Sequence, residues 1–248
     1  MDTTLADVWQ WIVQSHPEPT WWAILGSAVV ALVAVGQSTL WRQVRNLITI
    51  AHEGGHALVG VLTGRRLSGI RLHSDTSGLT ITRGRPTGPG AILTLAAGYT
   101  APALLGLGAA FLLAGGRTVI LLWITFALLV AMVIFIRNLY GFVALVVVGA
   151  VVFSASWYAT AEVQTTIAYL GTWILILGSI RPVFELRHRR RGKAGVQSDA
   201  DQLASMTAIP AAGWIFFFML VTIGAGAAGT WLLLPEAVTD TIVGVVAD

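Results

Sequence analysis

Seven long apolar runs constrain this chain more than any other feature of its sequence. A helix needs about 20 apolar residues to cross a hydrocarbon core about 30 Å thick, and most of the runs reach that length. Only 11% of the 248 residues are charged, whereas a typical soluble domain has about 25%. The chain lacks the polar surface of a water-soluble fold, so we predict an integral membrane protein. The runs cover residues 21–39, 47–63, 90–114, 118–136, 139–158, 164–180 and 211–234.

The remaining composition excludes several classes of site and partner. There is no cysteine, which excludes disulfides, thiolate metal sites and cysteine nucleophiles. The net charge is +3, but the basic residues flank the apolar runs, where they orient a membrane protein. We therefore expect the lipid bilayer and not a nucleic acid as the partner of these charges. The polar segment 1–20 lacks the basic start of a signal peptide, so the first run is expected to remain as a membrane helix.

The positions of the basic residues predict a topology. Six of them lie between Arg181 and Lys193, so loop 181–209 is expected on the cytoplasmic side of the plasma membrane. Counting back along the runs places the arginine-rich loop 64–89 on the same side, and Arg42 and Arg45 also favour it. If all these residues are cytoplasmic, run 47–63 cannot cross the membrane completely. The sequence leaves open whether that run spans the membrane or re-enters it.

Loop 64–89 is expected to contain a β-hairpin. Apolar and polar residues alternate on both sides of a turn-rich stretch, Ser74-Asp75-Thr76-Ser77-Gly78, within residues 67–84. Strict alternation of this kind indicates strands. The hairpin is either an ordinary surface feature or an edge onto which an extended substrate could pair.

The stretch Ala51-His52-Glu53-Gly54-Gly55-His56-Ala57 carries the strongest chemical signal. Residues four apart share one face of a helix, so His52 and His56 could ligate one Zn²⁺ ion. Glu53 would then act as the general base toward water. A chance match is expected about 0.002 times in a chain with this many histidines and glutamates. The alternative is a structural polar cluster, but ionisable groups within an apolar run are costly and are usually functional.

A catalytic zinc ion usually has three protein ligands, and the residues alone leave the third open. The extended pattern H-E-x-x-H-x-x-G-x-x-H is absent, because Val59 and Leu62 occupy its Gly and His positions. No glutamate follows at the spacing of a neighbouring helix, so the ligand is an aspartate or a distant residue. The candidates are His73, Asp75, Glu162, Glu185, His188, Asp199 and Asp201.

Several further motifs follow the HEGGH stretch in order, and together they resemble one family. They are Gly78-Leu79-Thr80, Ala97-Gly98-Tyr99-Thr100-Ala101-Pro102, Arg137-Asn138-Leu139-Tyr140-Gly141 and Ser198-Asp199-Ala200-Asp201-Gln202-Leu203-Ala204. The set resembles the compact, PDZ-less actinobacterial branch of the site-2 protease family of intramembrane zinc metallopeptidases. The resemblance covers about Arg45 to Trp214.

The resemblance implies a third ligand and a substrate contact. The family's Asn-x-x-Pro and Leu-Asp-Gly pattern is absent, but Ser198-Asp199-Ala200 matches the compact branch. It implies Asp199 as the third ligand, with Asp201 as runner-up; alternatively, Ser198 and Asp199 only cap a helix. It also implies that Asn138 or Tyr140 contacts the substrate or an oxyanion, against a purely interfacial role.

We therefore expect one all-α polytopic membrane domain, residues 1–248, with six or seven membrane segments and a small β-hairpin. The expected function is zinc-dependent cleavage of membrane-embedded protein substrates, that is, regulated intramembrane proteolysis. Two alternatives are a non-proteolytic, protease-like membrane scaffold and a metal-binding membrane protein. The intact Glu53 argues against the scaffold, and the lack of ionisable groups in the other runs argues against a metal transporter.

Overall fold

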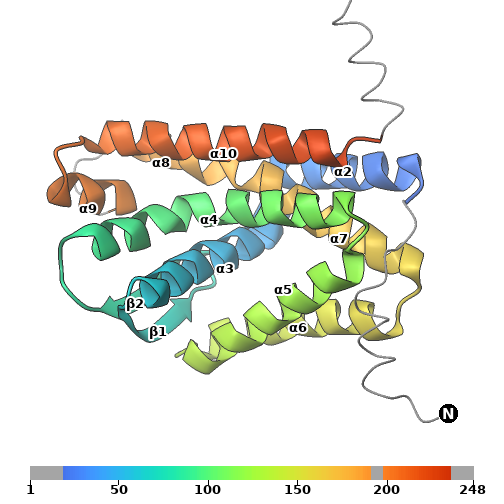
Figure 1. Ribbon diagram of the computed structural model, residues 1–248, viewed down its shortest axis with the longest axis horizontal. Helices are drawn as coiled ribbons and strands as arrows, with labels where there is room; N and C mark the ends of the chain where they lie inside the picture. Colours follow the sequence, from blue (N-terminus) through green and yellow to red (C-terminus); the bar gives the residue numbers. More distant parts are fainter. Residues whose placement is uncertain (1–18, 191–197, 236–248) are drawn as a thin grey trace, which may run out of the picture.

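The computed structural model describes residues 19–190 and 198–235, which form a bundle of helices with a small hairpin at one end (Figure 1). Most of the polar segment 1–20, part of the basic loop 181–209 and the C-terminal residues after 235 lie outside the described residues. In chain order the elements are α2 (Trp21–Gly36), α3 (Ser38–Leu62), β1 (Arg66–Leu72), β2 (Gly78–Arg83), α4 (Pro89–Ala114), α5 (Thr118–Phe135), α6 (Leu139–Tyr158), α7 (Ala161–Gly178), α8 (Ile180–Arg190), α9 (Asp199–Met206) and α10 (Ala211–Leu233).

The helices confirm the predicted polytopic membrane architecture. Within the described residues, five helices are long and apolar enough to cross a membrane, or up to six if the bent pair α2 and α3 counts as one span. The count of six equals the lower of the two expected numbers. Large apolar side chains on these helices point outward, for example Leu32, Phe111, Ile134 and Phe216, which are 59–70% exposed. In water such a surface would be unfavourable, whereas lipid tails accommodate it.

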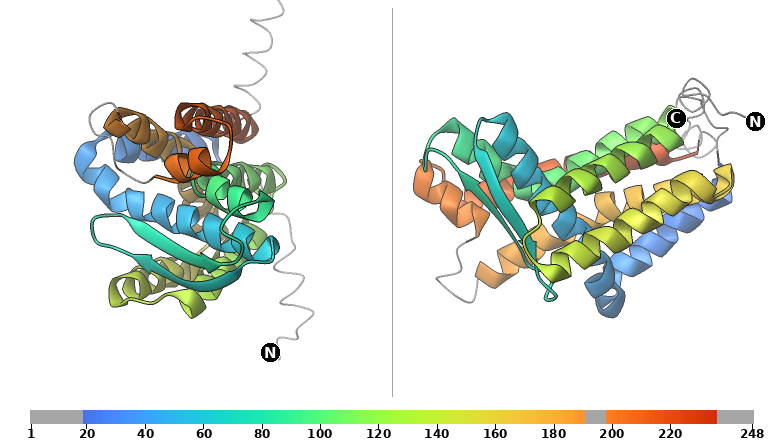
Figure 2. Two further views of the ribbon diagram at one scale, coloured as in Figure 1. Left: turned by 90° about the vertical axis from the view of Figure 1, so that its left-hand side faces the viewer. Right: turned by 90° about the horizontal axis from the view of Figure 1, so that it is seen from below.

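A sharp bend separates α2 from α3, and it changes the boundaries expected from the apolar runs. The two helix axes differ by 103°, and the break falls at Gln37, whose extended backbone begins α3 and whose side chain accepts a hydrogen bond from Leu40 N at 2.6 Å. Run 47–63 is therefore only the second half of a 25-residue helix. Figure 2 shows α3 running obliquely across the bundle beside the hairpin.

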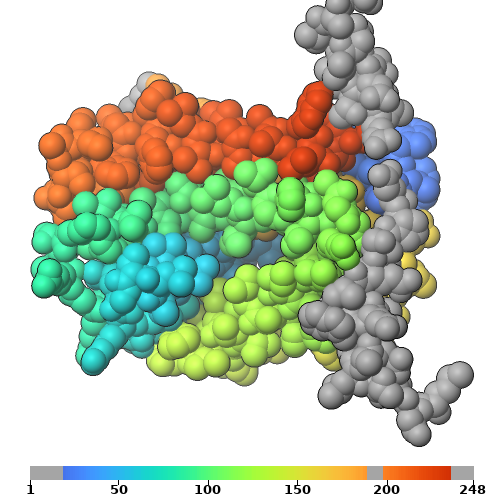
Figure 3. Space-filling model, in the orientation of Figure 1, coloured from blue at the N-terminus to red at the C-terminus, as the bar shows by residue number. Residues whose placement is uncertain are grey.

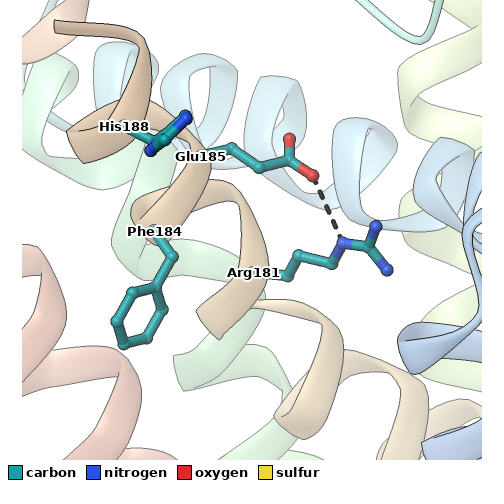
Figure 4. Close-up of a pocket in the computed structure, with 4 residues that line it drawn as sticks. All are labelled: Arg181, Phe184, Glu185 and His188. Atoms are coloured by element: carbon teal, nitrogen blue, oxygen red, sulfur yellow. Dashed lines mark hydrogen bonds and ion pairs between the residues drawn. The ribbon is translucent and has the colours of Figure 1, made fainter. Parts of the chain in front are cut away.

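Glu185 of α8 holds this corner together. Its carboxylate accepts a hydrogen bond from Trp41 Nε1 at 3.1 Å and forms ion pairs with Arg45 at 3.1 Å and Arg181 at 3.3 Å. Arg181 also donates to the Val35 carbonyl at the end of α2 and lies over the Trp41 ring. Trp41 is only 3% exposed in this corner. A groove of about 380 Å³ beside this corner is lined by Arg181, Phe184, Glu185 and His188 (Figure 4).

The predicted hairpin is confirmed as the antiparallel pair β1 and β2, with Ile70 opposite Thr80. The other edge of β1 is also engaged, by the connection between α5 and α6. Ile136 forms a parallel bridge with Ile70, and Arg137 N donates to the Ile70 carbonyl at 2.9 Å. Consequently β1 is bonded on both edges at Ile70, whereas β2 pairs with no second strand among the described residues.

The bundle has two chemically different ends (Figure 1). The hairpin, α9 and the C-terminal end of α8 share one end, together with the connection between α5 and α6. The start of α2, the end of α10 and the short connections after α4 and α6 lie at the other end. Arginines concentrate at the hairpin end, where Arg65, Arg66, Arg71, Arg83 and Arg85 belong to one loop.

Candidate metal centre

Three potential metal ligands meet between α3, α4 and α9. His52 and His56 lie one turn apart on α3, as their i, i+4 spacing requires, and their Nε2 atoms are 3.1 Å apart. Asp199, the first residue of α9, places its Oδ2 atom 3.3 Å from His52 Nε2 and 3.4 Å from His56 Nε2. In the described part of the chain this is the one group of three such residues that could hold a metal ion.

The size of this triangle suits a tetrahedral zinc ion. Zn–N and Zn–O bonds of about 2.0–2.1 Å at tetrahedral angles put neighbouring ligand atoms about 3.3 Å apart. The three observed separations span 3.1–3.4 Å. Two imidazoles and one carboxylate also form the usual donor set of a catalytic zinc site, which leaves a fourth position for water or substrate.

A backbone carbonyl determines which ring nitrogen of His56 carries the hydrogen. Its Nδ1 lies 2.7 Å from the Thr94 carbonyl oxygen on α4, and because a carbonyl can only accept, Nδ1 must carry the hydrogen. The Nε2 lone pair of the neutral ring is then available to a metal, and the ring orientation is fixed. His52 is held differently, with its ring edge-on to Tyr99 at 4.8 Å, and Tyr99 in turn stacks on Phe218 of α10.

The structure separates the two candidate aspartates of α9. Asp201 completes a capping box with Ser198: Asp201 N donates to Ser198 Oγ, and Ser198 N donates to Asp201 Oδ2. Asp199 instead points at the two histidines. Burial alone would raise the pKa of Asp199, but the adjacent His56 and His52 outweigh it and hold the pKa of that carboxyl well below its usual value. Within this motif Asp201 thus caps the helix with Ser198, and Asp199 joins the two histidines as a potential metal ligand.

Close approach of α4 to α3 depends on glycine at two positions. A Cβ atom on Gly98 would overlap His56 Nε2 and would lie 2.8 Å from His52 Cε1. On α3, a Cβ atom on Gly55 would collide with Ala101 and would lie 3.0 Å from the Ala97 carbonyl oxygen. Small residues at such contacts let helix backbones approach closely in membranes. Here they bring α4 against the imidazoles.

Glu53 is buried beside the hairpin. Only 4% of the residue is exposed, and its Oε2 accepts a hydrogen bond from Thr80 Oγ1 of β2 at 2.6 Å. A Cβ atom on Gly78 would overlap the Glu53 carboxylate, so β2 passes directly against this side chain. The carboxylate is therefore held by a strand and not by solvent.

The side chains of Asn138 and Tyr140 hydrogen-bond to β1 and α3 and not to the three potential metal ligands. The Asn138 amide bonds to both backbone groups of Leu72, donating to its carbonyl at 2.6 Å and accepting from its N–H at 3.2 Å. The Tyr140 hydroxyl donates to Asn46 Oδ1 at 3.3 Å. These contacts tie the connection between α5 and α6 to β1 and α3. A direct contact of either residue with substrate stays a prediction.

Four residues of the site are not singled out by the sequence as site residues: Gly78, Thr80, Thr94 and Gly98. Three of them stand in the ordered motifs, in Gly78-Leu79-Thr80 and in Ala97-Gly98-Tyr99, which signals that those motifs surround the site. Thr94 contributes only its backbone carbonyl. No side-chain pattern could reveal that contact.

A polytopic helical protein with a buried His-Glu-x-x-His stretch and a clustered aspartate has the features of the membrane metallopeptidase class. The model of the Peptidase M50B-like family matches residues 25–229. The chain therefore belongs to this family, and the site-2 protease family expected from the motifs is confirmed. Members of the family are zinc-dependent in general. No curated protein and no solved structure gives a significant match.

Proposed function

We propose that this protein is an intramembrane zinc metalloprotease that hydrolyses peptide bonds of membrane-embedded protein substrates in regulated intramembrane proteolysis. One observation carries the proposal: His52, His56 and Asp199 form a triangle of zinc dimensions, and Glu53 is buried next to His52 on the same helix. Membership of the Peptidase M50B-like family supports the same chemistry.

In this proposal each residue has a defined task. His52 and His56 hold the ion through Nε2 and Asp199 holds it through a carboxylate oxygen, while the Thr94 carbonyl keeps the His56 ring in place. A zinc ion bound there would supply Lewis acidity, which polarises a peptide carbonyl and acidifies water. Glu53 takes a proton from the attacking water and delivers it to the leaving amine.

The hairpin is the proposed docking edge for substrate. A transmembrane helix hides its carbonyls in internal hydrogen bonds, so a stretch of substrate must unwind before cleavage. The unwound backbone then needs partners, which an unpaired strand edge provides. On β2 the edge away from β1 is unpaired among the described residues, and Leu79 and Ile81 expose 49% and 40% of their surface beside it.

The proposed orientation puts the hairpin end of the bundle in the cytoplasm, at the plasma membrane. The arginines of that end follow the positive-inside rule, and the opposite end carries Arg117 in the turn after α4. The metal cluster lies where α9 meets α3 and α4. Cleavage is therefore expected toward the cytoplasmic side of the substrate segment.

The test compares the wild type with Glu53→Gln, purified in detergent. The substrate is a quenched-fluorescent peptide with a Leu/Ala transmembrane segment that a central Gly-Pro pair interrupts. We expect both proteins to bind one zinc ion and only the wild type to cleave, with the variant reduced by about 10²–10⁴-fold as for loss of a general base. Glu162→Gln, at an exposed carboxylate at the start of α7, is the matched control.

Equal cleavage by wild type and Glu53→Gln would overturn the proposal. Zinc binding without cleavage in the wild type would favour a scaffold or a metal-binding membrane protein. A wild type that binds no zinc would exclude every metal-dependent alternative.

A further inference from the structure

We infer that Thr80 is a positioning residue that orients the Glu53 carboxylate for catalysis. This inference rests on the proposed function, because it assigns a partner to the proposed general base. The Thr80 hydroxyl lies 2.6 Å from Glu53 Oε2 and 3.1 Å from the Glu53 carbonyl oxygen. It thus contacts both the side chain and the backbone of the same residue.

The carboxylate needs such a partner to keep one orientation. A buried carboxylate without hydrogen bonds is costly, and a glutamate side chain has several rotatable bonds. Among the described residues, Thr80 is the one side chain that donates a hydrogen bond to the Glu53 carboxylate. Gly78 closes the space beside the other carboxylate oxygen, Oε1, where a Cβ atom would overlap Glu53. Two residues of β2 therefore limit how the carboxylate can turn.

The position of Thr80 is itself fixed by the hairpin. Thr80 is paired with Ile70, which is fully buried and also bridges to Ile136. One turn before Glu53, Thr49 Oγ1 donates to the Thr76 carbonyl at 2.9 Å. The hairpin is thus attached to α3 at two successive turns. The orientation of Glu53 depends on the register of β2 along α3.

This arrangement gives Thr80 a role beyond filling space. The alternative is that its hydroxyl only satisfies a buried carboxylate, in which case its loss lowers stability and metal content along with activity. A positioning residue behaves differently. Its loss leaves the metal cluster and substrate docking intact and slows the chemical step, so kcat falls while KM and bound zinc stay constant.

The experiment measures kcat, KM and bound zinc for Thr80→Val, Thr80→Ser and Thr80→Ala with the same quenched transmembrane peptide. Valine replaces the hydroxyl by a methyl of similar size, and the Ser and Ala pair isolates the hydroxyl if the valine variant does not fold. The control is Thr125→Val. Thr125 is a partly buried threonine on α5, outside the hairpin, and its hydroxyl donates to the Leu121 carbonyl at 2.8 Å.

We expect Thr80→Val and Thr80→Ala to lower kcat by about 10- to 100-fold, less than loss of the base itself. KM should stay within about twofold and zinc at the wild-type level, because Thr80 hydrogen-bonds to the proposed base and to none of the three proposed metal ligands. Thr80→Ser should restore most of kcat, and Thr125→Val should resemble the wild type.

Two results would overturn the inference alone: wild-type kcat in both Thr80→Val and Thr80→Ala, or a loss of activity that follows a loss of zinc. Absence of zinc-dependent cleavage by the wild type would overturn the proposed function, and the inference with it. A fall in kcat for Thr125→Val equal to that for Thr80→Val would assign the effect to a general loss of stability and would also contradict the inference.

Discussion

At the scale of single residues, the α9 motif divides two tasks between two aspartates. The capping box needs a carboxylate at the third helical position, which Asp201 supplies. The first position lies beside the metal cluster, and Asp199 fills it. The helix start and the candidate metal site therefore share the four consecutive residues 198–201 without sharing a side chain.

Separate replacement of the two aspartates should separate these tasks. Loss of a residue that only supports a metal ligand typically weakens metal binding by about 10- to 100-fold. Asp199→Ala removes a proposed ligand itself, so we expect it to weaken zinc binding by more than that. Asp201→Ala should cost about 1 kcal/mol of stability through the lost cap and keep zinc. Equilibrium zinc titration and chemical unfolding measure both effects. If Asp201→Ala lost zinc and Asp199→Ala kept it, Asp201 and not Asp199 would be the metal ligand.

A second residue-scale prediction concerns the closest approach of α4 to the histidines. Gly98→Ala places a methyl group against His56 Nε2 and His52 Cε1, so the imidazoles must move and zinc affinity should fall by about 10- to 100-fold. Gly108→Ala is the matched control on the same helix, because a Cβ atom there meets nothing within 4 Å. That variant should keep zinc and gain up to about 1 kcal/mol of stability. Unchanged zinc affinity in Gly98→Ala would show that the cluster is more adaptable than this packing implies.

At the scale of elements, the corner between α2 and α3 determines where the histidines lie. Glu185 of α8 joins Trp41 and Arg45 of α3 to Arg181, which in turn binds the end of α2. Trp41 and Arg45 at the start of α3 thus have their polar partner in Glu185, a residue far along the chain. The corner thus fixes the N-terminal part of α3 against α8.

Glu185→Gln should therefore loosen the corner. Removing the charge weakens two ion pairs and a hydrogen bond at a partly exposed site, which we expect to cost about 1–2 kcal/mol of unfolding free energy. Arg187→Gln, at an exposed position on the same helix, should change stability little. Denaturant titration in mild detergent compares the two variants. Equal stabilities would mean that the corner is held by apolar packing alone.

The same corner shows how far the sequence could predict the fold and the site. His52 and His56 follow a helical spacing and the hairpin follows an alternation, so both are visible in local patterns. The true start of α3 at Ser38 is hidden, because Arg42 and Arg45 interrupt the apolar run and the partner of Arg45, Glu185, is distant in sequence. Thr80 and Gly98 are hidden for the same reason: their importance comes from contacts between elements that are remote in sequence.

At the scale of the whole molecule, the arginines concentrate at the hairpin end of the bundle. The bent path of α2 and α3 is compatible with this distribution of charge. Because α3 turns by 103° from α2, residues 41–46 and loop 64–89 need not lie on opposite sides of the membrane. The conflict between the charge rule and a spanning run 47–63 therefore has a structural solution. In that solution α3 crosses the bundle obliquely and does not continue α2.

The lack of cysteine makes the predicted orientation directly measurable. Single cysteines introduced at Ser74 in the hairpin turn and at Ser205 on α9, both exposed, should react with a membrane-impermeant maleimide only after the cytoplasmic side is opened. A cysteine at Thr160, exposed before α7 at the opposite end, should react in intact cells. Labelling of Ser74→Cys and Thr160→Cys from the same side would contradict the orientation.

The separation of the ligands along the chain affects how the protein would be made. Figure 3 shows the residues of α9 and α10 on the surface of the bundle, beside α4. The two histidines emerge from the ribosome early, whereas Asp199 follows only after α4 to α8 have been synthesised. An unfinished chain therefore carries an incomplete set of ligands. In the proposed protease, a nascent molecule would stay unable to cut its neighbours in the translocation machinery until nearly all of it had been inserted.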